Sequence, residues 1–210
     1  MRDRDFEHSV FVNCPFDKEY DHILQAVLYC LIRFGLKPRI ASERMDAGEA
    51  RLEKISELVA RSKYSIHDLS RCQAKEVGEH YRLNMPFELG LDFGCRNFGE
   101  ADHRGKKILI LEEQQFRYRA AISELAGSDI EAHRGDFQIA VRKVRNWLVD
   151  AGGFESIGAA RILSEYEDFQ EWYYERQLEA GFSEDDIQDY PTSELLQAML
   201  NWVSQGRPRK

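Results

Sequence analysis

Lys107-Ile108-Leu109-Ile110-Leu111 is a nearly continuous apolar run, and it decides the fold class of this 210-residue chain. A run with two apolar faces is typical of a strand that is covered on both sides in a parallel sheet. Three other strand-like segments precede it, at Val10–Val12, Pro38–Ala41 and Lys63–Asp68. Helical patterns separate the four runs, so the order of elements predicts repeated strand–helix units and a parallel sheet.

Apolar residues recur with helical spacing between these runs and after the last of them. This spacing predicts helices over Tyr20–Phe34, around Leu52 to Val59, from Asn84 onward and over Phe137–Leu148. Asn84 is expected to cap its helix, and Phe87 is expected to be buried by it. We also expect a helix over Phe116–Leu125 and a short edge strand over Asp129–His133.

The acidic residues are concentrated in the last part of the chain. Residues 151–210 contain twelve acidic and five basic residues, which gives a net charge of −7 out of the −8 of the whole chain. The same part has aromatic residues at near-helical spacing between 155 and 180 and a final helical pattern after Pro191. We therefore expect an α/β domain over residues 1–152 and an acidic helical extension over residues 153–210.

Composition and missing motifs exclude several functional classes. Apolar runs fall short of the roughly 20 residues that span a bilayer, and no signal peptide precedes the first strand, so we expect a cytoplasmic protein without a membrane partner. The negative charge argues against nucleic acid as a partner. The first strand–helix loop, Asn13–Asp17, has no glycine, which argues against a dinucleotide or P-loop phosphate site. The cysteines lack metal-ligand spacing, and no metal site is predicted.

Ligands of parallel α/β sheets bind outside the carboxyl ends of the strands. The residues expected near that edge as substrate-binding candidates are Asn13, Phe16, Asp17, Asp46, Ser70, Arg71, Asn84 and Asp92. Glu88 is delivered near the same edge by the start of its helix, where the peptide dipoles favour an ionised carboxylate. Such a carboxylate can stabilise an oxocarbenium ion or trap it covalently when a sugar–nitrogen bond is cleaved. The alternative is that Glu88 only complements the helix dipole.

Other candidates also have a structural alternative. Asp68 directly follows a predicted strand and is expected either to hold a ribose hydroxyl or orient Glu88, or else to cap the following turn. Asp92 is expected on the same helical face as Glu88, but a surface ion pair with Arg96, four residues on, is the competing prediction. Phe16 can stack on a base or belong to the core. His67 and His133 are expected to be hydrogen-bonded structural residues.

With these residues the chain resembles the superfamily that joins Toll/interleukin-1 receptor (TIR) domains to nucleoside 2-deoxyribosyltransferases. Val10 to Asp17 is similar to the opening TIR strand and loop, and Asn84 to Gly90 looks like the helix that bears the catalytic glutamate, which falls on Glu88. Asp68 is similar to the strand-end aspartate of the transferases. The loop Glu43–Glu49, which contains Asp46, is similar to a TIR loop implicated in self-association and access to the site. The resemblance covers about residues 8–150.

The resemblance implies a flavodoxin-like three-layer α/β sandwich, with a mostly parallel sheet of about five strands followed by the helical extension. It also implies N-glycosidic bond cleavage or transfer on NAD or a related nucleoside or nucleotide, with Glu88 and Asp68 as catalytic residues. NAD is then a substrate and no cofactor is expected. Bacterial antiphage defence, homo-oligomerisation and a regulatory protein bound through the C-terminal helices are further expectations. The alternative is a non-catalytic TIR-like signalling or scaffold module that acts through self-association.

Overall fold

A computed structural model describes residues 4–43, 48–71, 83–117, 122–125, 127–189 and 191–207. Its centre is an all-parallel, five-stranded sheet of order β2-β1-β3-β4-β5. The strands are β1 (Ser9–Asn13), β2 (Lys37–Ile40), β3 (Tyr64–Asp68), β4 (Lys107–Glu112) and β5 (Ile130–Ala132). This order is the flavodoxin-like arrangement, so the predicted fold class is confirmed.

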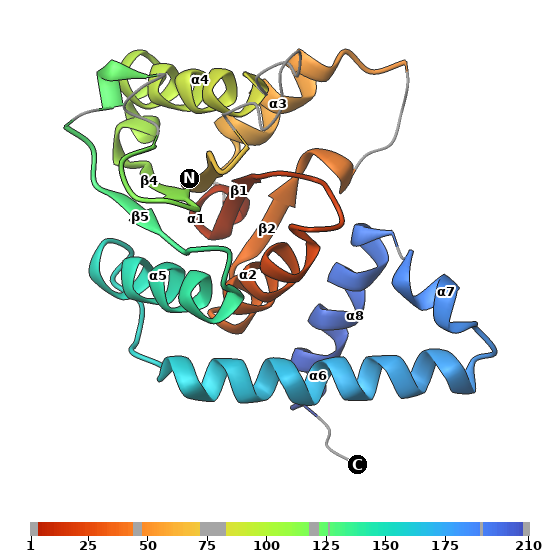
Figure 1. Ribbon diagram of the computed structural model, residues 1–210. Coiled ribbons are helices and arrows are strands. Elements are labelled where there is room, and N and C mark those ends of the chain that lie inside the picture. The colour runs from red at the N-terminus through yellow and green to blue at the C-terminus, as the bar shows by residue number, and fades with distance from the viewer. Residues whose placement is uncertain are drawn as a thin grey trace.

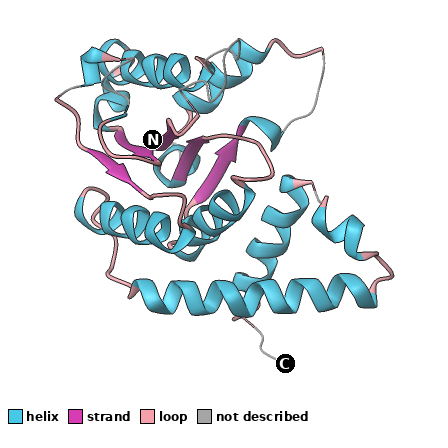
Figure 2. Ribbon diagram, viewed as in Figure 1, coloured by secondary structure: helices cyan, strands magenta, loops and turns pink. Residues whose placement is uncertain are grey.

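Helices cover both faces of the sheet (Figures 1 and 2). One face carries α3 (Arg51–Ala60) and α4 (Asn84–Phe98), and the other carries α2 (Asp21–Arg33) and α5 (Phe137–Asp150). Alternate residues of β1 point to opposite faces: Val10 packs in the α2–α5 core, whereas Phe11 packs against α3. Because both faces are covered, every residue of β1 and β3 is buried, including the polar residues Ser65, His67 and Asp68 of β3.

The C-terminal helices lie on the outer side of α2 and α5, away from the sheet (Figure 1). They are α6 (Ala159–Glu179), α7 (Glu184–Gln188) and α8 (Thr192–Ser204). Their aromatic residues pack on α2, where the ring of Tyr29 lies 5.9 Å from that of Phe169 and 6.0 Å from that of Trp202. The extension therefore shares one continuous core with the α/β layers. Among the described residues, no helix is long and apolar enough to cross a membrane.

Three local predictions about the helices are wrong. α4 begins at Asn84, but Leu83 occupies the N-cap position and the cap has no side-chain hydrogen bond. Phe87 is 56% exposed rather than buried. The predicted helix over Phe116–Leu125 does not begin at Phe116, which lies in a turn with φ of 68°, and its end is a 3-10 turn at Ser123–Leu125. A short helix, α1 (Arg4–His8), precedes β1 and was not expected.

Candidate functional site

The candidate site lies where the strand order changes direction. The chain passes from β1 to β2 on one side and then returns to place β3 on the other side of β1. Loops diverge at such a switch point and leave a crevice outside the carboxyl ends of the two strands, which is where ligands of open α/β sheets bind. Asn13 and His67 are register partners at these two strand ends. The predicted edge is therefore occupied by polar side chains.

Asn13 connects three elements at this point. Its amide nitrogen donates to the carbonyl oxygen of Met85, in the first turn of α4, at 3.0 Å, and lies 3.0 Å from Nδ1 of His67. Because Nδ1 of His67 faces a donor, it accepts, and the proton of a neutral ring is on Nε2. His67 Nε2 lies 3.0 Å from Asp92 Oδ2 and donates to it. These buried contacts fix the start of α4 over β1 and β3.

Asp92 is fully buried, so the predicted surface ion pair with Arg96 is wrong. Its Oδ1 lies 3.2 Å from Nζ of Lys106, the residue that precedes β4. Lys106 is 1% exposed and also donates to the carbonyl oxygens of Val59, at 2.7 Å, and Ser62. Burial acts to raise the pKa of Asp92, but His67 and Lys106 together hold that pKa below its usual value. Asp92 is thus a charged group fixed inside the fold, and its predicted contact with substrate stays a prediction.

Glu88 lies one helical turn before Asp92 and is 5% exposed. Its Oε1 lies 3.5 Å from a guanidinium nitrogen of Arg51, whose side chain is 62% exposed at the start of α3. Burial raises the pKa of Glu88 above its usual value, and the charge of Arg51 opposes this only in part. Glu88 is the fifth residue of α4, beyond the first turn where helix dipoles act most strongly. The position near the helix start predicted that the peptide dipoles favour the ionised form, whereas burial, the largest effect on this pKa, favours the neutral form.

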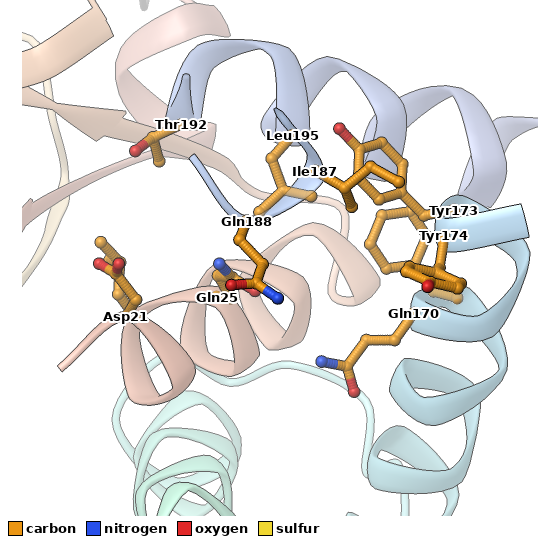
Figure 3. A pocket seen from close by; sticks show the side chains of 11 residues that line it. Asp21, Gln25, Gln170, Tyr173, Tyr174, Ile187, Gln188, Thr192 and Leu195 are labelled. Carbon is orange, nitrogen blue, oxygen red and sulfur yellow. The ribbon is translucent and has the colours of Figure 1, made fainter. Parts of the chain in front are cut away.

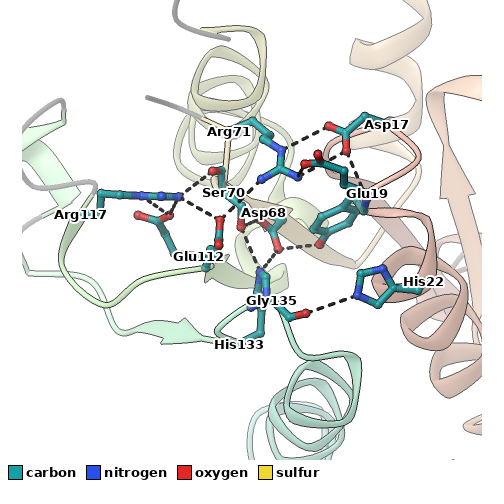
Figure 4. Close-up of polar contacts among 12 residues, drawn as sticks. Asp17, Glu19, His22, Asp68, Ser70, Arg71, Glu112, Arg117, His133 and Gly135 are labelled. Carbon is teal, nitrogen blue, oxygen red and sulfur yellow. Dashed lines mark hydrogen bonds and ion pairs between the residues drawn. The ribbon is translucent and has the colours of Figure 1, made fainter. Parts of the chain in front are cut away.

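Asp68, at the end of β3, is fully buried in a second polar cluster (Figure 4). The hydroxyl of Tyr20 donates to its Oδ2 at 2.6 Å, and the backbone N–H of Ser70 donates to its Oδ1 at 2.8 Å. His133 Nε2, from the segment after β5, lies 3.0 Å from Oδ2. Burial acts to raise the pKa of Asp68, but the contacts with His133, Ser70 and Tyr20 hold it below its usual value. Both oxygens have internal partners, and a direct part in sugar chemistry stays a prediction.

Ser70 and His133 have the spacing of a nucleophile and its base, because Ser70 Oγ lies 3.0 Å from His133 Nε2. The hydrogen bonds of His133 and Ser70 do not allow His133 to accept the proton of the Ser70 hydroxyl. The backbone N–H of Gly135 donates to His133 Nδ1 at 3.0 Å, so Nε2 of the neutral ring carries a proton and has no lone pair to accept one. The hydroxyl of Ser70 donates to Asp68 instead. The arrangement thus stabilises the loops and does not activate a serine.

An outer layer of ion pairs surrounds Asp68 (Figure 4). Arg71 Nε lies 3.3 Å from Asp17 Oδ2, and its Nη2 lies 3.1 Å from Glu19 Oε2. Arg117 pairs with the buried Glu112 at 2.5 Å and donates to the carbonyl oxygen of Ser70 at 2.6 Å. The predicted residues Asp17, Asp68, Ser70 and Arg71 are therefore brought together in one network.

The two polar clusters lie side by side. Cys14, which follows Asn13, is buried, and its pKa is raised first by burial and then by the charge of Asp68, with smaller contributions from Asp21 and Glu88. Phe16 is 45% exposed at the same edge, so it is not a core residue. Asn84 is exposed at the start of α4. Asp46 lies outside the described residues.

Several residues that shape the site were not predicted from the sequence. Three of them contact a predicted carboxylate from 14 to 48 residues away in the chain: Arg51 contacts Glu88, Lys106 contacts Asp92 and Tyr20 contacts Asp68. The fourth, Arg117, joins the Asp68 network by donating to the carbonyl oxygen of Ser70. The one available signal was the basic pair Lys106-Lys107 at the start of an apolar strand, where a buried charge requires a partner.

The described residues contain no group of three or more histidine, cysteine, aspartate or glutamate side chains placed to hold a metal ion. Comparison with family models, with curated proteins and with solved structures gave no match to this chain.

Proposed function

We propose that this protein cleaves or transfers an N-glycosidic bond in NAD or a related nucleoside or nucleotide, with Glu88 as the reacting carboxylate. The observation that carries the proposal is the contrast between Glu88 and its neighbours. Asp68 and Asp92 are fully buried, and internal partners lower their pKa values, whereas the pKa of Glu88 is raised and its partner Arg51 is largely exposed. A buried carboxylate with a perturbed pKa, at the sheet edge where ligands of this fold class bind, is a functional candidate.

The chemistry requires one carboxylate near the anomeric carbon. As the bond between that carbon and the base nitrogen breaks, its electron pair leaves with the base and the sugar gains oxocarbenium character. The ionised Glu88 stabilises this charge or forms an ester bond with the carbon. The oxygen of a water molecule, or the nitrogen of a second base, then bonds to the carbon and releases Glu88, and the proton of the attacking group passes to solvent.

Resemblance adds support from a second direction. The segment Asn84–Gly90 is similar to the glutamate-bearing helix of the TIR and deoxyribosyltransferase superfamily, and Glu88 is the residue that matches the catalytic glutamate. The flavodoxin-like strand order is the order that this superfamily implies. The proposal names a class of substrates because NAD and simpler nucleosides share the N-glycosidic bond that is broken.

A substrate survey tests the proposal. The protein is incubated with NAD, with nucleosides and with nucleoside monophosphates, and the released base is followed by chromatography beside the Glu88→Gln variant. We expect at least one substrate to release its base with the wild-type protein and not with the variant. Base release that survives in Glu88→Gln would remove Glu88 from the mechanism.

Arg51 provides a prediction about pH. Because Arg51 opposes the upward shift in the pKa of Glu88, Arg51→Gln is expected to raise that pKa further. The reaction uses the ionised carboxylate, so activity falls as pH drops through the pKa, and this acid limb moves to higher pH in the variant. Arg51→Lys keeps the charge and serves as the control. An acid limb at the same pH in wild type and Arg51→Gln would contradict the role given to Arg51.

The alternative, a scaffold module that acts through self-association, is favoured by one observation. Large apolar side chains are exposed beyond the carboxyl ends of β1 to β4, in loops or near the starts of the helices α3 and α4: Phe16, Leu52, Leu83, Phe87 and Phe116. Clustered exposed apolar residues are typical of interaction surfaces. The same edge holds Glu88, so association there and catalysis are compatible.

Phe87 and Phe98 give a matched test of self-association. They lie near opposite ends of α4 and are 56% and 90% exposed. If the carboxyl edge self-associates, light scattering after size-exclusion chromatography will show a mass above that of one chain for the wild type and Phe98→Ser, and a lower mass for Phe87→Ser. A single-chain mass for all three proteins at high concentration would count against the scaffold function.

A further inference from the structure

A cavity of about 310 Å³ lies between α2 and the three helices of the C-terminal extension (Figure 3). It is separate from the Glu88 edge, since none of its lining residues belongs to the two polar clusters. Its volume is at the lower end of the roughly 300–1,000 Å³ that is usual for small-molecule sites. Sites of this kind combine apolar walls with a few convergent polar groups. The cavity has both.

One wall is aromatic and comes from α6. Phe169 and Tyr173 are almost fully buried, with ring centroids 5.7 Å apart and ring planes 27° apart. Tyr174 also lines the cavity, and its hydroxyl donates to Glu184 Oε1 at 3.0 Å, which ties α6 to α7. A wall that contains aromatic side chains favours an aromatic ligand, whose ring can pack against them.

The polar groups of the lining are mainly amides. Gln25 of α2, Gln170 of α6 and Gln188 of α7 come from three helices and extend toward the same space (Figure 3). Each side-chain amide offers two N–H donors and an acceptor oxygen. The edge of a heteroaromatic ring presents donors and acceptors in alternation, which amides can match and a purely apolar ligand cannot.

The charge of the cavity limits the ligand further. Asp21 is its one carboxylate, and no lysine or arginine is among the described residues that line it. The extension that forms three of its walls belongs to the part of the chain with a net charge of −7. A phosphate group would therefore enter a negative environment without the basic partners that usually bind it.

We propose that this cavity binds an uncharged or cationic heteroaromatic molecule of the size of a nucleobase or nucleoside, and that it discriminates against the phosphorylated form. The ring lies against the aromatic wall of α6, and its edge contacts the amides of Gln25, Gln170 and Gln188. This site is additional to the one proposed at Glu88 and does not depend on it.

Isothermal titration of the full chain with adenine, adenosine and adenosine 5′-monophosphate tests the proposal. We expect saturable binding of adenine and adenosine and at least about tenfold weaker binding of the monophosphate. Gln170 and Gln188 are both exposed enough to be replaced without disturbing the core. Each single change to alanine is expected to weaken adenosine binding about fivefold, which corresponds to the loss of one hydrogen bond worth about 1 kcal/mol.

Gln197→Ala is the matched control, because Gln197 is exposed on α8 and is not part of the lining. It should bind adenosine as the wild type does. The proposal is overturned if neither adenine nor adenosine binds, if the monophosphate binds as well as adenosine, or if binding is unchanged in the Gln170→Ala/Gln188→Ala double variant. Base release in that double variant reports on the Glu88 site separately, so the two proposals can fail independently.

Discussion

Replacing Lys106 by methionine is expected to lower the free energy of unfolding by about 3–5 kcal/mol, the range typical when one partner of a buried ion pair is removed. Lys106 is 1% exposed, and its ammonium group lies 3.2 Å from Asp92 Oδ1. Methionine fills a similar volume without a charge, so the variant leaves the carboxylate of Asp92 buried without its cation. Urea denaturation followed by circular dichroism measures the effect.

Lys107→Met is the matched control, because Lys107 is the next residue and is exposed. This change is expected to stay within about 0.5 kcal/mol of the wild type. Adding Asp92→Asn to Lys106→Met removes the uncompensated charge, so the double variant should lose less stability than the two single changes added together. Equal stability of Lys106→Met and Lys107→Met would show that the ion pair does not support the fold.

The same pair predicts how stability depends on pH. The pKa of Asp92 is lowered in the folded protein, so its contribution is present above the unfolded-state pKa of about 3.9 and is lost as pH falls through the lowered folded-state pKa. In Lys106→Met the folded-state pKa rises, and Asp92 is protonated at higher pH. Unfolding measured across an acid pH series is expected to show the wild type losing this contribution at lower pH than the variant. Coinciding pH profiles of stability for wild type and Lys106→Met would contradict the effect of Lys106 on the pKa of Asp92.

Most of the fold was predictable because periodicity is a local property of the sequence. The apolar run Lys107–Leu111 became β4, and the helical pattern Phe137–Leu148 became most of α5. α7 was missed because a five-residue helix is too short to show a period. The expected helix at Phe116 failed because turn geometry with positive φ overrides a weak apolar pattern.

The candidate site was predictable only in part, since side-chain partners depend on the folded chain. The rule that ligands bind at the carboxyl ends of the strands placed Asp17, Asp68 and Arg71 near one another. In the structure Arg71 pairs with Asp17, and Tyr20 hydrogen-bonds to both Asp17 and Asp68. The local i, i+4 rule paired Asp92 with Arg96 because those two are neighbours in the helix, whereas the actual partner, Lys106, arrives from another element.

Replacing Glu88 by glutamine is expected to reduce kcat for base release by at least about 10³-fold, because the amide cannot form the glycosyl ester or stabilise the oxocarbenium ion as a charge does. The same change should leave stability equal or increase it. Burial raises the pKa of Glu88 in the folded state, so the charged form disfavours folding at pH values above the unfolded-state pKa, and an uncharged isostere removes that effect.

Asp92→Asn is the matched comparison, because Asp92 lies one turn further along α4 and the chemical change is the same. The pKa of Asp92 is lowered in the fold, so its replacement is expected to destabilise the protein at neutral pH. Removing the charge is therefore expected to lower stability at Asp92, whose ionised form stabilises the fold, and not to lower it at Glu88, whose ionised form does not. If Glu88→Gln were destabilising to the same degree as Asp92→Asn, Glu88 would be a structural residue.

The most direct test of catalysis by Glu88 is the rate of base release per folded molecule, measured for wild type and Glu88→Gln with the substrate that the survey selects. Folded concentrations are matched by circular dichroism, so that a difference in rate is not a difference in folding. We predict that the wild type releases base and that Glu88→Gln releases it at least about 10³-fold more slowly. Equal rates for the two folded proteins would contradict the assignment of Glu88 as the reacting carboxylate.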